Sequence, residues 1–327
     1  MILIISNTQD LTSDFVVREI SRRRLPFARL NTDEFLSTCL GLASFGFGER
    51  PKMLIRWENR QIRLDFDQVS AVLYRRPVPP VPDKSINDSS LRQFCVDECY
   101  DFLRGLWFSL RCHWISDPMS IRKAEHKIYQ LNIAHSLNLM IPKTVVTNDP
   151  AQVRDLFYSC ARGIIIKPLY LGFISHPQSP QMIFTSAVSE ADLDDIDSVR
   201  CAPSIFQERV EKDFDVRVTV VGERVFSAQI KVDSLPPNIP DWRFAPLEKL
   251  KHSVYDLPRN IEKRCLELVK LLGLDFGAID LAVDRDGNHI FFEINPNGQW
   301  AWLETVLNFP ISQAIVDRLS DPYLSSG

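Results

Sequence analysis

The sequence has little glycine and no marked excess of charge. Only 12 of its 327 residues are glycine, and 38 Lys and Arg residues against 42 Asp and Glu residues leave a net charge of −4. The low glycine content excludes a collagen-like chain. The near balance of charge excludes the strongly basic surface with which many proteins grip nucleic acid, so we expect no nucleic-acid partner.

Cysteine pairs and long apolar runs are also missing. The seven cysteines are scattered without a CxxC pair, which predicts reduced thiols and a cytoplasmic protein. No stretch approaches the ~18 apolar residues of a membrane span, so we expect no membrane partner. The apolar start, Met1–Ile5, is too short for a signal peptide and predicts a first strand instead.

The glycine-rich motifs that bind nucleotide phosphates are absent. The chain contains no GxxxxGK[ST] loop, and its glycines at positions 41, 46 and 48 lack GxGxxG spacing. These absences exclude a P-loop enzyme and give no support to a dinucleotide-binding fold.

What is present predicts an α/β protein. Hydrophobic residues make up 45% of the chain, enough for a sizeable core, and the order strand, helix, strand opens the sequence. We predict a proline-rich loop at 77–82, one helix at 119–139, an irregular stretch at 233–258 and a hairpin at 276–295.

The hairpin at 276–295 brings acidic residues together. Asp286-Gly287 is a strong signal for a tight turn, because such a turn needs a positive φ. A hairpin centred there places Asp280 directly opposite Glu293, and Asn295 lies on the same face because side chains alternate along a strand.

Two opposed carboxylates repel each other and destabilise a sheet unless a cation neutralises them. Carboxylate and amide oxygens are ligands that suit Mg²⁺. The register is supported by apolar neighbours expected on the buried face, namely Ile279, Leu281, Phe292 and Ile294. The alternative is a solvated edge hairpin whose acids face water; the register favours a metal site.

Basic residues suggest a nucleotide beside this metal, since Mg²⁺ with few protein ligands usually accompanies phosphates. Lys167 ends an apolar strand and Lys127 starts a helix. Acids near the strand 206–210 are suited to ribose hydroxyls and its backbone to an adenine edge. Three further cations, each equally plausible as a surface charge, are available to compensate the acids: Arg217, Lys231 and Arg243.

Together these residues resemble the ATP-grasp superfamily, and more narrowly the graspetide (microviridin-type) ligases that mature ribosomal peptides. The final motif, Phe-Glu-Ile-Asn-Pro-Asn-Gly at 292–298, is the most specific part of the match. The narrower resemblance rests on five segments: Tyr74-Arg75-Arg76-Pro77, Ala124-Glu-His-Lys127, Ile141-Pro-Lys-Thr144, Asn148-Asp-Pro150 and Asn295-Pro-Asn-Gly-Gln-Trp300.

The resemblance implies an ATP-grasp fold in three parts: an N-terminal pre-ATP-grasp α/β domain at 1–115, a central lid lobe at 116–208 and a C-terminal lobe with the metal site at 209–327. It implies that one set of residues holds ATP: Lys127, Lys167, Glu208, Arg209 and Asp215. It implies that Asp280, Glu293 and Asn295 carry Mg²⁺. Arg217 and Arg243 are expected near the transferred phosphoryl group, and Arg76 near the acyl phosphate or an acidic core peptide.

The resemblance further implies an ADP-forming ligase that activates side-chain carboxylates of a precursor peptide as acyl phosphates. A Ser or Thr hydroxyl, or a Lys amine, then closes a macrolactone or macrolactam ring. The precursor would combine a leader with a core containing Thr or Ser and Asp or Glu, and a homodimer is possible. The alternatives are an amino-acid or glutamate ligase acting on a small substrate or protein terminus, and a non-catalytic ATP-binding protein. One departure is that only Gly172 is available for a phosphate loop after Lys167.

Overall fold

The computed structural model describes residues 1–58, 62–170, 172–174, 181–232 and 249–321. Contacts between residues divide the chain into two compact units. The first unit comprises 1–118, 299–304 and 310–327, and the second comprises 119–298 and 305–309. The C-terminal helix therefore groups with the first unit, and the three-part division stays a prediction.

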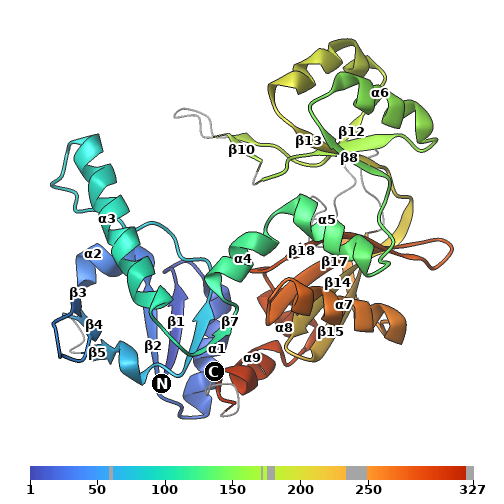
Figure 1. Ribbon diagram of the computed structural model, residues 1–327. Helices are drawn as coiled ribbons and strands as arrows, with labels where there is room; N and C mark the ends of the chain where they lie inside the picture. Colours follow the sequence, from blue (N-terminus) through green and yellow to red (C-terminus); the bar gives the residue numbers. More distant parts are fainter. Residues whose placement is uncertain (59–61, 171, 175–180, 233–248, 322–327) are drawn as a thin grey trace. The chain divides into compact units, whose positions relative to one another are not determined.

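The first unit is built on a parallel sheet in the order β2-β1-β6-β7 (Figure 1). Its strands are β1 (Ile2–Ser6), β2 (Phe27–Asn31), β6 (Ala71–Tyr74) and β7 (His113–Ile115). Parallel strands buried on both faces read as continuous apolar runs, as Ile2–Ile5 does. The sequence did not predict β7, because three residues carry too little periodicity.

Helices cover this sheet. Helix α1 (Leu11–Arg22) contacts α9 (Ile311–Leu319), and α9 also contacts β6 and β7. The opposite side is packed by α3 (Ser89–Phe108) and by a small antiparallel sheet, with Leu3, Ile5, Trp57, Leu103 and Trp107 in one core. The small sheet contains β3 (Cys39–Ser44), β4 (Lys52–Trp57) and β5 (Ile62–Asp65), and it is joined by η1 (Thr32–Glu34), α2 (Phe35–Thr38) and η2 (Phe66–Gln68).

The second unit begins with an antiparallel sheet in the order β12-β9-β13-β8. Its strands are β8 (Thr144–Thr147), β9 (Ile164–Lys167), β12 (Ser186–Val188) and β13 (Ser204–Glu208). Helix α6 (Pro150–Ser159) and η3 (Ala191–Cys201) pack on it through a core that includes Leu156, Leu193 and Phe206. A further strand pair is β10 (Phe173–Ile174) with β11 (Gln181–Met182).

The candidate site lies on a second antiparallel sheet of this unit, in the order β16-β15-β14-β17-β18. The strands are β14 (Lys212–Val221), β15 (Arg224–Val232), β16 (Leu250–Val254), β17 (Phe276–Asp284) and β18 (His289–Asn295). Helix α7 (Arg259–Leu271) packs against β14 and β17, while α5 (Lys127–Ser136) runs beside the edge strand β18 (Figure 1).

Two local predictions were wrong, and one helix was missed. The single helix expected at 119–139 is two helices, α4 (Pro118–Ala124) and α5, because His126 adopts an extended backbone at φ −75°, ψ 112° and starts a new helix. The stretch 233–258, expected to be irregular, contains β16 among its described residues. Helix α8 (Ala301–Leu307) was not predicted.

The register predicted for the acidic hairpin is confirmed at Asp280 and Glu293 and differs by one residue near the turn. Asp280 pairs with Glu293, and Gly287 has the expected positive φ of 83°. A bulge then pairs Leu281 with Phe291, which leaves Phe292 as an extra residue on β18. Phe291 is therefore the buried side chain, and the prediction that Phe292 is buried was wrong.

Gly277 allows the sheet to approach α7 closely, and this leads to a prediction. A Cβ at Gly277 would lie 2.7 Å from Ile294 Cδ1 and 3.1 Å from Val269 Cγ2, both in the core. We expect Gly277→Ala to lower the free energy of unfolding by about 1–3 kcal/mol through overpacking. Urea denaturation measures the change.

The matched control is Gly105→Ala in α3, where an added Cβ meets nothing within 4 Å. There the alanine should stabilise the helix by about 0.5–1 kcal/mol. Equal effects of the two substitutions would contradict the packing argument.

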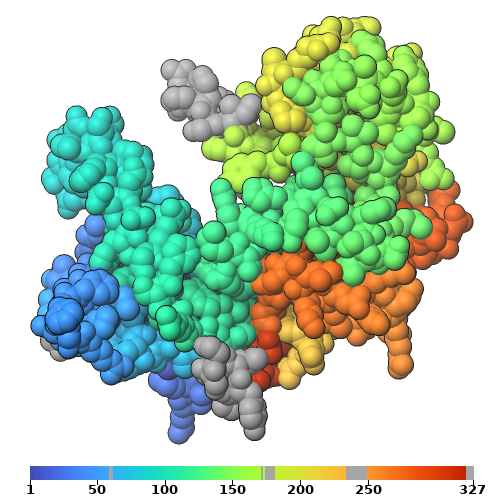
Figure 2. All heavy atoms as spheres, in the orientation of Figure 1, coloured from blue at the N-terminus to red at the C-terminus, as the bar shows by residue number. Residues whose placement is uncertain are grey.

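The N-terminal half of α3 extends away from the sheet of its unit, and Figure 2 shows its side chains exposed. Leu91 and Phe94 are 58% and 61% exposed on this segment.

Across the described residues, no helix is both long and apolar enough to cross a bilayer.

Candidate functional site

The acidic residues of the hairpin meet on the face of the sheet opposite α7. Asp280 on β17 pairs directly with Glu293 on β18. Asn295 Nδ2 donates to Glu293 Oε1 at 3.1 Å and lies 3.4 Å from Asp280 Oδ2. The alternation of β17 and β18 thus brings the three predicted metal ligands together.

Two side-chain cations neutralise these acids. Arg217, opposite Asp280 on β14, donates from Nε to Asp280 Oδ1 at 2.6 Å. Lys127, the first residue of α5, donates from Nζ to Glu293 Oε2 at 2.7 Å. The opposed carboxylates that would otherwise repel are each paired with a positive charge from a neighbouring element.

The donor set fits a Mg²⁺ ion. Two carboxylates and one amide converge, and turning the Asn295 amide over would present its oxygen in place of its nitrogen. Glu293 Oε1 and Asp280 Oδ2 face the amide, while Glu293 Oε2 and Asp280 Oδ1 contact the cations. Arg217 Nη2 also donates to Asp280 Oδ2, at 3.5 Å. Among the described residues no group of three or more His, Cys, Asp or Glu side chains is placed to hold a metal ion.

Asp215 lies two residues before Arg217, on the same face of β14. It is 7% exposed, and its carboxylate is 2.6 Å from Lys212 Nζ. Lys212 was not singled out from the sequence, since a lysine at a strand start is usually a solvated surface charge. The predicted role of Asp215 in binding ATP stays a prediction.

The strand-end lysine Lys167 is held by the buried side-chain amide of Gln207. Its Nζ donates to Gln207 Oε1 at 3.2 Å, and Gln207 Nε2 donates to Thr144 Oγ1 at 2.8 Å. Gln207 is only 1% exposed, so its side chain fixes the end of β9 against β13 and β8. Lys167 therefore ends its strand as predicted, and its ammonium group is hydrogen-bonded to Gln207, the residue before Glu208.

Glu208 and Arg209 follow at the end of β13. Their backbone N–H groups donate to Lys143 O at 2.8 Å and to Gly163 O at 3.0 Å. These two N–H groups are already paired within the protein. If the backbone of this strand binds an adenine edge, as predicted, it must do so through other backbone groups.

The arginine pair Arg75-Arg76 lies in the first unit, and the acidic hairpin in the second. Arg75 is 3% exposed; its Nε lies 3.7 Å from Asp10 Oδ2, and Nη2 donates to Gln299 Oε1 at 3.4 Å. Burial lowers the pKa of Arg75 to about 10, against the opposing effect of Asp10, which leaves the guanidinium charged at neutral pH. Arg76, predicted to be catalytic, is exposed and has a positive φ of 39°.

Burial also tends to raise the pKa of Asp10, but the charge of Arg75 and hydrogen bonds from Ser13 and Ser6 outweigh it. The pKa of Asp10 is therefore lowered, and the pair is ionised at neutral pH. Arg243, the remaining predicted catalytic residue, lies outside the described residues.

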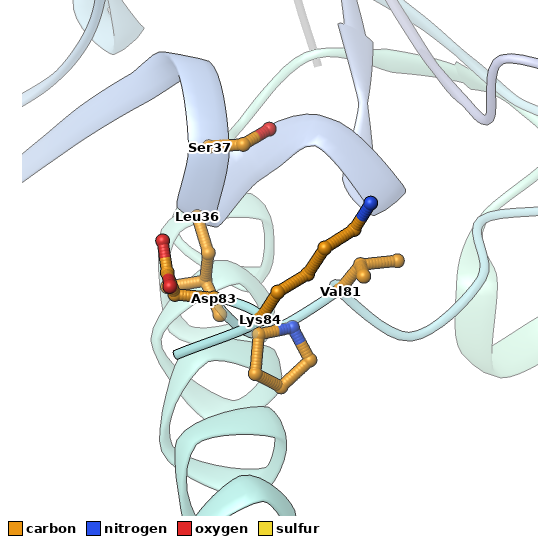
Figure 3. Close-up of a pocket in the computed structure, with 6 residues that line it drawn as sticks. Leu36, Ser37, Val81, Asp83 and Lys84 are labelled. Atoms are coloured by element: carbon orange, nitrogen blue, oxygen red, sulfur yellow. The ribbon is translucent and has the colours of Figure 1, made fainter. Parts of the chain in front are cut away.

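A pocket of about 410 Å³ in the first unit contains none of the predicted site residues (Figure 3). It is lined by Leu36, Ser37, Val81, Pro82, Asp83 and Lys84. Its walls come from α2 and the proline-rich loop, and the cluster of paired acids and cations that defines the candidate site is on the other unit.

Comparison with known proteins supports the class that this fold and site define. The model of the MvdD pre-ATP grasp domain matches residues 1–122. Over 215 residues the chain is 20% identical to the alpha-aminoadipate–LysW ligase LysX of Sulfurisphaera tokodaii, covering 63% of this chain and 71% of the relative. The fold is that of ATP-grasp ligases, mixed α/β in architecture, as the sequence predicted.

Two solved structures extend the likeness over almost the whole chain. The macrocyclase MdnC from Microcystis aeruginosa, bound with its precursor peptide MdnA, is 33% identical with a TM-score of 0.85, covering 97% of this chain and 98% of that one. A RiPP-associated ATP-grasp ligase from Chryseobacterium gregarium, in complex with ADP and a leader and core peptide, is 28% identical with a TM-score of 0.88, covering 97% and 96%. This chain belongs to the family of RiPP-associated ATP-grasp ligases, and it is an ADP-forming enzyme of that family.

Proposed function

We propose that this chain is an ATP-dependent macrocyclase that closes rings within a ribosomally made precursor peptide. The observation that carries the proposal is its 33% identity, over 97% of its length, to a macrocyclase bound with its precursor. The charged face of β14, β17 and β18 supports the same reaction, because phosphoryl transfer depends mainly on positioning and on neutralising charge.

The proposed reaction has two steps. A side-chain carboxylate of the core peptide attacks the γ-phosphorus of ATP and displaces ADP, which leaves an acyl phosphate. A Ser or Thr hydroxyl or a Lys amine then attacks the acyl carbon, loses its proton and displaces phosphate. The peptide loses one water for each ring, and holding both reacting groups within one chain favours closure.

We assign the ATP contacts to Lys127, Lys167, Glu208, Arg209 and Asp215, and the metal ligands to Asp280, Glu293 and Asn295. Mg²⁺ would supply positive charge to the phosphate oxygens. Arg217, already fixed by Asp280, would face the transferred phosphoryl group together with Arg243. Lys127 would release Glu293 and turn to a phosphate when the nucleotide binds. Arg76 would attract the carboxylates of the peptide.

The proposal is tested by incubating the protein with ATP, Mg²⁺ and a candidate precursor whose core contains Thr or Ser and Asp or Glu. The expected result is ADP release that requires the precursor, with a peptide mass lower by one water per ring. Ring closure in the absence of ATP would contradict the proposed chemistry.

The similarity to LysX supports a second candidate, ligation of a free amino acid to a carboxylate. The same mass measurement separates the two functions, because ligation adds the mass of an amino acid less one water, whereas ring closure only removes water. The 20% identity to LysX over part of the chain makes this the weaker candidate.

A further inference from the structure

The strand that carries two of the proposed metal ligands lies at the edge of its sheet. Strand β18 is last in the order β16-β15-β14-β17-β18, so every second residue directs its N–H and C=O groups away from β17. Ile294, between Glu293 and Asn295, is such a residue. Unpaired groups at a buried edge are costly, and they also leave the peptide planes free to tilt.

A single side chain pairs with both groups of Ile294. Gln130 Oε1 accepts from the Ile294 N–H at 3.1 Å, and Gln130 Nε2 donates to Ile294 O at 2.8 Å. The second hydrogen of the same amide is donated to Ala124 O at 2.6 Å. The Gln130 amide therefore takes part in three hydrogen bonds, and the residue is 1% exposed. Its two bonds to Ile294 replace those that a neighbouring strand would make.

The position of Gln130 in α5 couples two parts of the site. It lies one helical turn after Lys127, and residues three apart share a face of a helix. The same face of α5 therefore contacts the side chain of Glu293 through Lys127 and the backbone of the next residue through Gln130. The bond to Ala124 O also ties the end of α4 to the start of α5.

The other side of Ile294 is fixed as well. Its side chain is fully buried and faces the α7 side of the sheet, next to Gly277. With the backbone held by Gln130 and the side chain held in the core, the flanking carboxylate and amide have little freedom to move apart.

We propose that Gln130 is a positioning residue for the metal site: its amide sets the peptide planes on either side of Ile294 and thereby the separation of the Glu293 and Asn295 side chains. The side-chain amide of Gln130 bonds the backbone of Ile294 and of Ala124, so its effect on the two ligands is transmitted through Ile294. This inference rests on the proposed assignment of Glu293 and Asn295 to the metal. Groups that orient metal ligands typically change metal affinity or activity about 10–100-fold when they are replaced.

The test measures metal binding rather than turnover. Mn²⁺ is titrated into the full-length protein with saturating ADP, and free Mn²⁺ is followed by electron paramagnetic resonance; ADP binding without metal is measured by calorimetry. Gln130→Met keeps the length and volume of the side chain and removes all three hydrogen bonds. We expect its affinity for Mn²⁺ with ADP to fall at least about tenfold, while metal-free ADP binding changes less than about twofold.

A second variant and a control complete the design. Gln130→Glu keeps the shape and one acceptor but places a carboxylate against two carbonyls, so it should weaken Mn²⁺ binding at least as much. The control, Tyr255→Phe, removes a 2.8 Å hydrogen bond to His289 at the other end of β18 and should leave Mn²⁺ binding unchanged.

The outcomes separate this inference from the proposed function. Absence of Mn²⁺ binding with ADP in the wild-type protein would overturn the proposed function and this inference with it. Wild-type binding with unchanged affinity in a folded Gln130 variant would overturn the inference alone. Equal losses of metal-bound and metal-free ADP affinity, or failure of both variants to fold, would make Gln130 a purely structural residue and would also overturn it.

Discussion

Replacing Glu293 by alanine should reduce precursor-dependent ADP release by about a thousandfold, with ring closure falling in parallel. A metal ligand contributes several kcal/mol to stabilising the transferred charge, and each 1.4 kcal/mol is about tenfold in rate. The substitution also removes the 2.7 Å contact that holds Lys127. Initial rates of ADP formation, with mass spectra of the peptide, measure the effect.

The control for this prediction is Glu267→Gln on α7. Glu267 is a half-exposed carboxylate, and its only ion pair within the described residues is at 4.0 Å to Lys263, so its loss should change the rate less than about twofold. The Glu293 side chain is 17% exposed and forms an ion pair, so its replacement also affects stability. The melting temperature of the Glu293→Ala variant should therefore be recorded beside the rate. A folded Glu293→Ala protein with undiminished ring closure would remove this residue from the site.

Replacing Arg217 by methionine should have the largest effect on stability, lowering the free energy of unfolding by about 3–5 kcal/mol and abolishing turnover. Arg217 and Asp280 are 7% and 13% exposed, and their 2.6 Å bond spans neighbouring strands at the centre of the sheet. Removing one partner leaves a nearly buried carboxylate without its cation, which is far more costly than losing a surface pair.

The double variant Arg217→Met, Asp280→Asn tests the cause. With no unpaired charge left, it should regain at least half of the lost stability while remaining inactive, because both groups belong to the proposed site. Urea denaturation and ADP release measure the two effects separately.

The matched control uses a surface pair of the same sheet, Lys231 on β15 with Asp213 on β14, at 3.1 Å and about half exposed on each side. Lys231→Met should cost no more than about 1 kcal/mol. If Arg217→Met and Lys231→Met lowered the free energy of unfolding by similar amounts, burial would not set the strength of the Arg217 pair.

The acidic hairpin could be predicted because its information is local. The Asp-Gly turn limits the register to within one residue, and alternation along β18 places Glu293 and Asn295 on one face. The bulge at Phe292 was not predictable in the same way, since it depends on how β18 fits against its neighbours. It falls between the turn and the acids, and the residue that it adds to β18 brings Asp280 opposite Glu293; without it Asp280 would pair with Phe292.

The partners of these acids were harder to predict because they are distant in the sequence. Lys127 was assigned to ATP through the family resemblance, and nothing local indicated that it contacts Glu293, 166 residues later. Gln130 carried no signal at all, because a glutamine in a helix is usually a surface residue. Only the packing of α5 along β18 makes it a buried amide with three hydrogen bonds.

The sequence by itself determined the class of the protein and which acids meet, through turn chemistry, strand alternation and a specific acidic motif. The tertiary structure alone decided which cations neutralise those acids: Arg217 from the next strand and Lys127 from a helix. The physical reason is that a strand's own pattern specifies its faces and register, whereas the pairing of buried charges depends on which distant elements pack against it.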